Sequence, residues 1–198
     1  MDLFDLTLPI QAGMPVLPGD PPVTFTRLHS HGGDGYELTR LSLGSHTGTH
    51  LDAPRHFFPD GATLDRYPVD RLVGPGLIVD CRPPSGHGRI GAALLAERLR
   101  PFAVPSKSFV LLRTAGAFLS IEAAQALLDA GVTLVGTDGP SLDTEPYPVH
   151  RLLLGQGVLL AENLAGLERL GPGPVTCAFL PLAVVGTDGA PVRAVAWR

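Results

Sequence analysis

Four histidine and aspartate side chains lie close together between residues 46 and 56, in the stretch SHTGTHLDAPRHFF. They are His46, His50, Asp52 and His56, in a chain that has only seven histidines. Imidazole nitrogens and carboxylate oxygens bind zinc and its first-row neighbours, and three such ligands with one open position are typical of a catalytic site. A single histidine more often caps a turn, but the density of these four predicts a metal centre.

The spacing of the ligands restricts the backbone that could bring them together. On a straight strand His46 and His50 would lie ~13 Å apart, whereas each must approach a shared ion to about 2 Å. The backbone must therefore curl, which Gly48 permits because glycine reaches dihedral angles closed to other residues. A helical HxxxH arrangement is disfavoured by Gly48, by Pro54 and by the missing glutamate of an HExxH motif. We expect a loop or the bent end of a strand.

The string HTGTHLDAPRHF resembles the HxGTHxDxPxH motif of the cyclase family of metal-dependent hydrolases, whose best-known members are bacterial kynurenine formamidases. Downstream, VGTDGPSLD followed by HRLLLGQGVLLAENL is similar to a second family signature, in which a histidine and a glutamate twelve positions later complete a two-metal site. The N-terminal strand and the PVLPGD loop also fit. The resemblance therefore covers most of the chain.

Carried over residue by residue, the resemblance implies a site with two divalent metal ions, Zn²⁺ or Mn²⁺. The implied ligands are His46, His50, Asp52, His150 and Glu162. The first three would hold one ion, His150 would bind the second, and Asp52 and Glu162 would each reach both. The positive charge of two divalent ions exceeds the negative charge of two carboxylates and one hydroxide. The centre therefore keeps a residual positive charge that can activate water and bind a carbonyl oxygen.

The implied reaction is attack of a metal-held hydroxide on an amide or formamide carbonyl, with His56 passing a proton to the leaving nitrogen. The substrate would be a small molecule with a non-peptide C–N bond, such as N-formylkynurenine, which yields kynurenine and formate. A metal-dependent lyase or cyclase is the alternative within enzymes. A metal-binding protein without turnover is the alternative outside them.

One departure from the family pattern concerns the substrate. Kynurenine formamidases have PVWPGD where this chain has PVLPGD, so Leu17 occupies the position of a tryptophan that would contact the aromatic ring of the substrate. Leucine cannot stack on an aromatic ring as tryptophan does. A hydrolase of a cyclic amide, similar to isatin hydrolase, therefore competes with an arylformamidase.

Other polar residues have weaker claims. Ser141 and Asp143 precede His150, where they could orient ligands or simply form a turn. The tripeptide Thr-Asp-Gly follows both Gly136 and Gly186, which we interpret as turn chemistry and not as a repeat. The remaining histidines, His29, His31 and His87, receive no role.

Short apolar runs, separated by 20 prolines and 24 glycines, predict a fold rich in strands and turns. Strands are expected at 3–10, 23–29, 36–43, 76–81, 109–114, 132–137, 157–160, 175–182 and 192–197. Helices are expected at 90–100, 121–130 and 150–155, the second with Ser120 as its N-cap and Gly131 as its stop. The strand-helix-strand unit around residue 125 favours an α/β class.

The resemblance further implies a swivelling β/β/α arrangement, with a mixed sheet flanked by helices, and a homodimer. The 198 residues are expected to form one domain, 1–198, with a large core, since 44% are hydrophobic and only 17% are charged.

Composition also excludes several classes of partner. The net charge is −4 and no basic cluster occurs, which argues against nucleic-acid binding. No apolar run reaches the ~18 residues of a membrane span, and the acidic start MDLFDLTLPI is not a signal peptide. We therefore expect a cytoplasmic protein. Cys81 and Cys177 lack metal or redox spacing and are expected to be buried free thiols.

Overall fold

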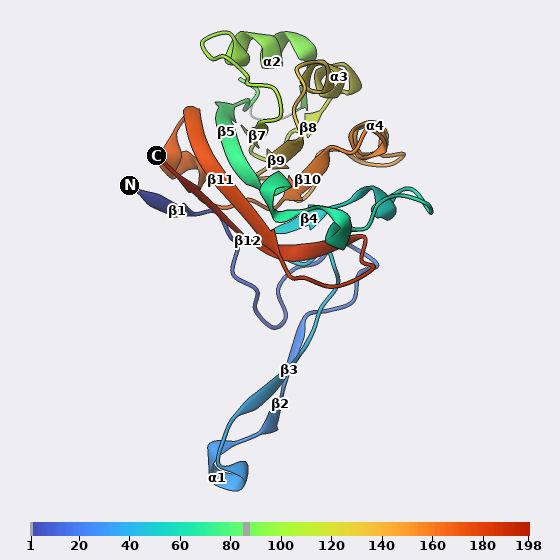
Figure 1. Ribbon diagram of the computed structural model, residues 1–198, viewed down its shortest axis with the longest axis vertical. Helices are drawn as coiled ribbons and strands as arrows, with labels where there is room; N and C mark the ends of the chain where they lie inside the picture. The colour runs from blue at the N-terminus through green and yellow to red at the C-terminus, as the bar shows by residue number, and fades with distance from the viewer. Residues whose placement is uncertain (1, 85–87) are drawn as a thin grey trace.

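The computed structural model describes residues 2–84 and 88–198, and at its centre a mixed sheet closes on itself (Figure 1). The strands follow the order β12, β11, β5, β7, β9, β10, β4, and β4 pairs again with β12 to complete a seven-stranded barrel. Their bounds are β4 His50–Asp52, β5 Val73–Asp80, β7 Phe109–Arg113, β9 Leu134–Thr137, β10 Leu159–Glu162, β11 Gly173–Pro181 and β12 Gly189–Trp197. The mixed α/β class is confirmed, whereas closure of the sheet into a barrel was not predicted.

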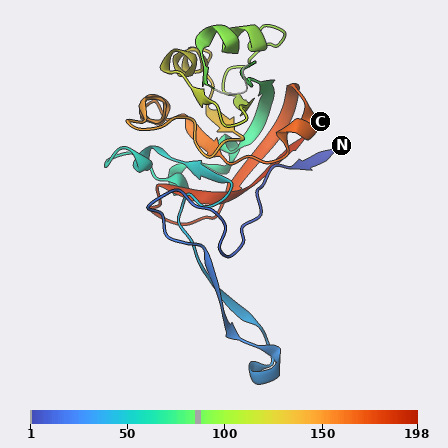
Figure 2. The ribbon, with the colours of Figure 1, turned by 180° about the vertical axis from the view of Figure 1, so that it is seen from behind.

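The barrel has a parallel half and an antiparallel half. Strands β5, β7, β9 and β10 run parallel to one another, and β4, β12 and β11 complete the ring through antiparallel pairs. A further strand, β1 (Leu3–Asp5), pairs with the outer side of β12, so the two chain ends lie side by side (Figure 2). The first and last described strands are thus held in one sheet.

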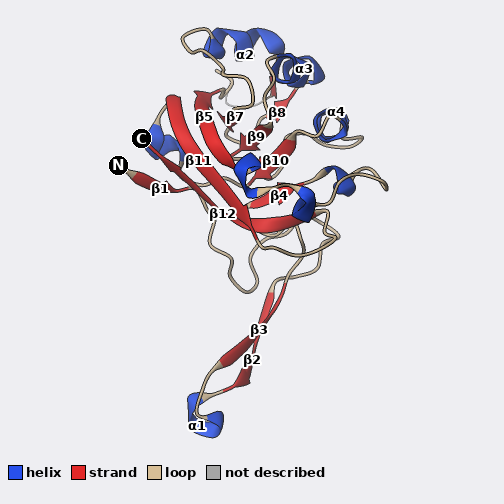
Figure 3. Cartoon of the chain, viewed as in Figure 1, coloured by secondary structure: helices blue, strands red, loops and turns tan. Residues whose placement is uncertain are grey.

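Three helices connect the parallel strands and cover their outer face (Figure 3). They are α2 (Ala92–Leu99), α3 (Ile121–Asp129) and α4 (Pro148–Gly155). Successive residues of β7 alternate between two cores, because Val110 and Leu112 pack with the helices while Phe109 and Leu111 pack inside the barrel. The near-continuous apolar runs of these strands follow from burial on both faces.

Helix α3 begins at the predicted residue and ends one residue before its predicted end. The Ser120 side chain accepts a hydrogen bond from the backbone N–H of Ala123, and Gly131 adopts a positive φ directly after the helix. Helix α4 also matches its predicted range closely, beginning at Pro148 instead of 150.

The prediction of a strand over 3–10 was wrong beyond Asp5. The Asp5 carboxylate accepts a hydrogen bond from the backbone N–H of Thr7, which bends the chain, and Pro9 has no N–H to continue a ladder. The bend directs the following residues to the metal-ligand segment, where Leu8 N–H donates to the Thr49 hydroxyl.

A hairpin projects from the body as a narrow arm (Figure 1). Its strands are β2 (Thr24–His29) and β3 (Leu38–Ser42), close to the predicted ranges, with a single helical turn, α1 (His31–Asp34), between them. Every residue of β3 is exposed, and so are all residues of β2 except His29.

Several short elements were not predicted. They are β6 Arg89–Ile90, β8 Phe118–Leu119, α5 Leu167–Leu170 and the 3₁₀ turns Pro54–His56, Leu64–Arg66 and Val69–Arg71. One of them, β6, contains Ile90, which was expected in the helix 90–100, whereas that helix begins only at Ala92.

Two further predictions concern cysteines and membranes. Cys81 and Cys177 are both free and buried, as expected. None of the described helices combines the length and the apolar character needed to cross a bilayer.

Candidate metal centre

The histidine-rich segment turns sharply before it enters β4, as predicted. Gly48 has a φ of +63°, and Thr49 fastens the turn by donating to the backbone oxygen of Asn163 at 2.6 Å. His50 and Asp52 then lie two residues apart on the same face of β4. The curl brings His46 back over this short strand, where its ring lies 5.0 Å from that of His50.

The distant residues reach the same place through the sheet and through α4. Strand β10 runs antiparallel to β4, and Glu162 is paired directly with His50. His150 projects from α4, which precedes β10. The structure therefore brings together residues about a hundred positions apart, as the family resemblance implied.

Two imidazole nitrogens and two carboxylates converge in the buried part of this cluster. His50 Nε2 lies 3.2 Å from Asp52 Oδ1 and 3.6 Å from Glu162 Oε2. His150 Nε2 lies 3.1 Å from Glu162 Oε1 and 3.7 Å from Asp52 Oδ2. Each of the four side chains is less than 5% exposed. Asp52 and Glu162 thus both face both imidazoles.

A second group lies on the outer side of Asp52. His46 Nδ1 is 2.7 Å from Asp52 Oδ1, and the rings of His46 and His56 are 4.0 Å apart. The Asp188 carboxylate contacts both rings, at 2.9 Å from His46 Nε2 and 3.2 Å from His56 Nδ1. Donor atoms of His46, Asp52 and His56 are close enough to share an ion, and so are those of His50, Asp52 and Glu162.

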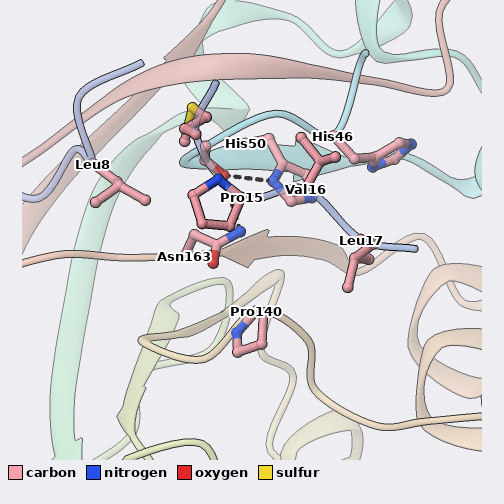
Figure 4. Close-up of a pocket in the computed structure, with 10 residues that line it drawn as sticks. Leu8, Pro15, Val16, Leu17, His46, His50, Pro140 and Asn163 are labelled. Atoms are coloured by element: carbon pink, nitrogen blue, oxygen red, sulfur yellow. Dashed lines mark hydrogen bonds between the residues drawn. The ribbon is translucent and has the colours of Figure 1, made fainter. Parts of the chain in front are cut away.

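Each of the three predicted imidazole ligands has one nitrogen held by an acceptor outside the cluster. His50 Nδ1–H donates to the Gly48 carbonyl at 2.9 Å, a bond drawn in Figure 4. His150 Nδ1 pairs with the Asp143 carboxylate, and His46 Nε2 with Asp188. The remaining nitrogen of each ring therefore faces Asp52 or Glu162, as outer partners commonly arrange for metal ligands.

The donor set fits a divalent cation. The described contacts of Asp52 and Glu162 are with histidines and with the backbone N–H of Leu142, and no lysine or arginine of the described residues forms an ion pair with either. Two buried carboxylates need compensating positive charge, and imidazole with carboxylate suits zinc, manganese and their neighbours.

The pKa values of two histidines in the cluster also indicate a site that favours positive charge. Burial opposes protonation of His46, but the carboxylates of Asp188 and Asp52 raise its pKa to about 10. The pKa of His150 likewise rises to about 10 against the effect of burial, because of Asp143 and Glu162. The cluster attracts positive charge strongly.

His56 differs from the other histidines of the site. Burial and the neighbouring His46 lower its pKa, while Asp188 and Asp52 act in the opposite direction. Its side chain is 32% exposed, against 3% for His50. A neutral, accessible imidazole is compatible with the predicted proton transfer, and its position beside His46 and Asp52 would also allow ligation.

Two adjoining cavities open beside the cluster. The larger, of about 300 Å³, is lined by His46, His50, His56, His150, Glu162, Phe57, Tyr147, Ser141, Asp20, Pro18 and Leu17. The smaller, of about 210 Å³, is mainly aliphatic, with Leu8, Met14, Val16 and Leu17 among its lining residues (Figure 4). Leu17 therefore lies where the two cavities meet.

Sequence reasoning found some supporting residues and missed others. Asp143, considered as a possible orienting group, does contact His150. Asn163, which adopts a positive φ and donates to the Gly48 carbonyl, was missed because nothing in its neighbourhood marks it. Asp188 was assigned only to a turn. His29 and His31 lie on the projecting hairpin, and His87 lies outside the described residues.

Comparison with known proteins covers almost the whole chain. Residues 4–144 match the Cyclase family. A kynurenine formamidase of Salinibacter ruber is 35% identical, with 98% of this chain and 97% of that protein covered. Among solved structures, a potential metal-dependent hydrolase with cyclase activity has a TM-score of 0.81 and 30% identity, covering 98% of this chain and 96% of the other. Isatin hydrolase A from Ralstonia solanacearum has a TM-score of 0.87 and 25% identity, covering 98% and 91%.

Proposed function

Because the chain belongs to the cyclase family of metal-dependent hydrolases, we propose that it hydrolyses a non-peptide C–N bond of an amide or formamide. One observation carries the proposal: His50, Asp52, His150 and Glu162 converge in a buried cluster at the wall of a cavity. The match to the family model ends before His150 and Glu162, so the inclusion of these two residues rests on the second family signature and on their position in the structure.

We assign the cluster to two divalent ions, zinc or manganese, with Asp52 shared between them. His46 and His50 would complete the ligands of the first ion. His150 and Glu162 would complete those of the second, and Glu162 would be within reach of both ions. Metal ions bound there would polarise a carbonyl oxygen and lower the pKa of a water molecule. The chain contributes fixed ligand orientations, since each imidazole is held from behind by Asp188, Gly48 or Asp143.

His56 moves the proton in this proposal. Hydrolysis forms a bond between water oxygen and the carbonyl carbon, breaks the C–N bond and leaves one proton of the water on the nitrogen. His56 lines the larger cavity and is paired with Asp188 through Nδ1, so its Nε2 is available to take that proton and deliver it.

The two cavities differ in the chemistry of their walls, since the smaller is mainly aliphatic and the larger has aromatic residues among its lining. Leu17, at 48% exposure, supplies an aliphatic surface where the two cavities meet. Phe57 and Tyr147 give the larger cavity one aromatic side. N-formylkynurenine remains a candidate through the formamidase relatives, and the isatin hydrolase likeness together with Leu17 favours a cyclic amide as the second candidate.

Metal removal and restoration tests the proposal directly. Protein stripped with a chelator is expected to lose all activity, and zinc or manganese is expected to restore it on at least one of N-formylkynurenine, aliphatic formamides, isatin and simple lactams. The summed mass of the products should exceed that of the substrate by one water molecule, since a lyase or cyclase would add none. Failure of the reloaded protein on every compound would contradict the proposal.

We also propose that the projecting hairpin joins two copies of the chain in a homodimer. A two-stranded hairpin has little stability alone, and this one exposes Phe25 and Leu41 as a directly paired apolar couple, at 40% and 59%. A second copy would cover this surface.

The F25D/L41D variant is therefore expected to run as a monomer by light scattering at micromolar concentration, whereas the unmodified chain runs as a dimer. Ile121→Asp is the matched control, because Ile121 is 39% exposed and lies on α3, away from the arm. A monomeric unmodified chain would overturn the proposal.

A further inference from the structure

Asp188 occupies an unusually well fixed position for a residue in a loop. It immediately precedes β12, and its backbone oxygen accepts from Ala53 N–H at 2.8 Å. The preceding Thr187 oxygen accepts from Leu64 N–H at 3.0 Å. These two backbone hydrogen bonds connect the loop to residues before and after the Pro54–His56 turn. They fix the position of the Asp188 backbone, and with it that of its side chain.

A single carboxylate oxygen of Asp188 serves two histidines with different proposed roles. Asp188 Oδ2 lies 2.9 Å from His46 Nε2, on a proposed metal ligand, and 3.2 Å from His56 Nδ1, on the proposed proton carrier. The carboxylate accepts a hydrogen bond from each ring. The other nitrogen of His46, Nδ1, then faces Asp52, and the other nitrogen of His56, Nε2, makes no contact with Asp188. One residue thus sets the orientation and the tautomer of both rings.

The residue after Asp188, Gly189, permits the contact between Asp188 and His46 because it has no side chain. A Cβ on Gly189 would lie 2.6 Å from the Leu51 carbonyl oxygen and 2.9 Å from His46 Cε1. Neither approach is tolerated, and the first involves backbone that cannot rotate away. Only glycine at this position lets β12 pass close enough for Asp188 to reach His46.

The aspartate of the other Thr-Asp-Gly tripeptide contacts a different segment of the chain. Asp138 accepts from the backbone N–H and the hydroxyl of Thr114, each at 2.7 Å, and approaches the N–H of Ala115. None of its described hydrogen bonds reaches a histidine. Turn chemistry therefore does not describe the contacts of either side chain, and of the two only Asp188 has described contacts with histidines.

From this geometry we propose that Asp188 is a positioning residue, whose carboxylate holds the rings of His46 and His56 in the orientation that hydrolysis requires. The inference rests on the proposed hydrolase function. Removal of such an outer partner typically lowers metal affinity or activity by about 10–100-fold. Because Asp188 touches neither substrate nor the reacting atoms in this proposal, kcat should fall while KM stays within about twofold.

Asp188→Ala tests the proposal, with Asp138→Ala as the matched control in the same tripeptide. We expect Asp188→Ala to lower kcat and zinc affinity by about 10–100-fold each. In ¹⁵N-labelled, zinc-loaded protein, long-range ¹H–¹⁵N spectra should show that His56 loses its Nδ1-protonated tautomer. Asp138→Ala should keep that tautomer and the zinc affinity. If Asp188→Ala does not fold, Asp188→Asn, which preserves the shape and removes the charge, is expected to give the same changes in smaller measure.

Two results overturn the inference: an unchanged His56 tautomer in the Asp188 variants, or an equal loss of zinc affinity in Asp138→Ala. The spectroscopic and binding readouts need no turnover. An unmodified chain that hydrolyses no compound, combined with the expected tautomer change, would therefore contradict the proposed function while supporting the positioning role.

Discussion

Replacement of Asp52 by asparagine is expected to lower kcat/KM by about 10³-fold or more, together with metal content. The two oxygens of Asp52 are the centre of the cluster, with Oδ1 facing His46 and His50 and Oδ2 facing His150. Asparagine removes the charge and turns one acceptor into an NH₂ donor that faces imidazole nitrogens. Loss of a metal that contributes several kcal/mol to the transition state corresponds to a fall of about this size.

Elemental analysis and steady-state kinetics on the same preparation measure both effects. Asp129→Asn is the control, because Asp129 is a carboxylate of α3 whose described hydrogen bond is with the Gln125 amide, remote from the cluster. Since Asp52 is buried, circular dichroism must show that the variant is folded, and Glu162→Gln provides a second test of the same centre. A folded Asp52→Asn protein that keeps its metal and its rate would refute the shared-ligand role.

The side chains that converge in the cluster could be named from the sequence because some are clustered and the others match the spacing of the family signature. Four candidate residues lie within eleven positions, and Gly48 signals the curl that the structure contains. Strands β7 and β9 and helix α3 were found for a similar reason, since apolar period and capping are local features. The part of the centre between residues 46 and 56 and the parallel half of the fold thus have local sequence signals, whereas His150 and Glu162 were indicated only by the family resemblance.

Closure of the barrel could not be predicted in the same way. It depends on the pairing of β4, a strand of only three residues, with both β10 and β12. Pairing between residues more than a hundred positions apart leaves no periodicity in either segment. The resemblance supplied a mixed sheet with helices but not this closure.

Asp188 was missed for a related reason. Its tripeptide is identical to the one at Asp138, and both are good turn sequences. Only the return of β12 beside β4 places one of them against His46 and His56. What each of the two aspartates contacts is therefore set by tertiary structure, since Asp138 contacts Thr114 instead.

Substitution of His56 by alanine distinguishes a proton carrier from a metal ligand, and both from a protein that binds metal without catalysis. If His56 carries the proton, kcat should fall by about 10²–10⁴-fold while the metal content is unchanged. If it is a ligand, as its position beside His46 and Asp52 would permit, metal content should fall with kcat. If the protein only binds metal, no rate exists to lose and no measured property should change.

The choice of substrate sharpens this test, because a proton carrier matters most when the leaving group is a poor one. An amide nitrogen must be protonated as it departs, whereas a phenolate leaves without a proton. We therefore expect His56→Ala to cost far less on an activated aryl ester than on an amide, and His31→Ala, on the projecting hairpin, to leave both rates intact. An equal loss on ester and amide, with the metal retained, would show that His56 serves the site in some way other than proton delivery to the nitrogen.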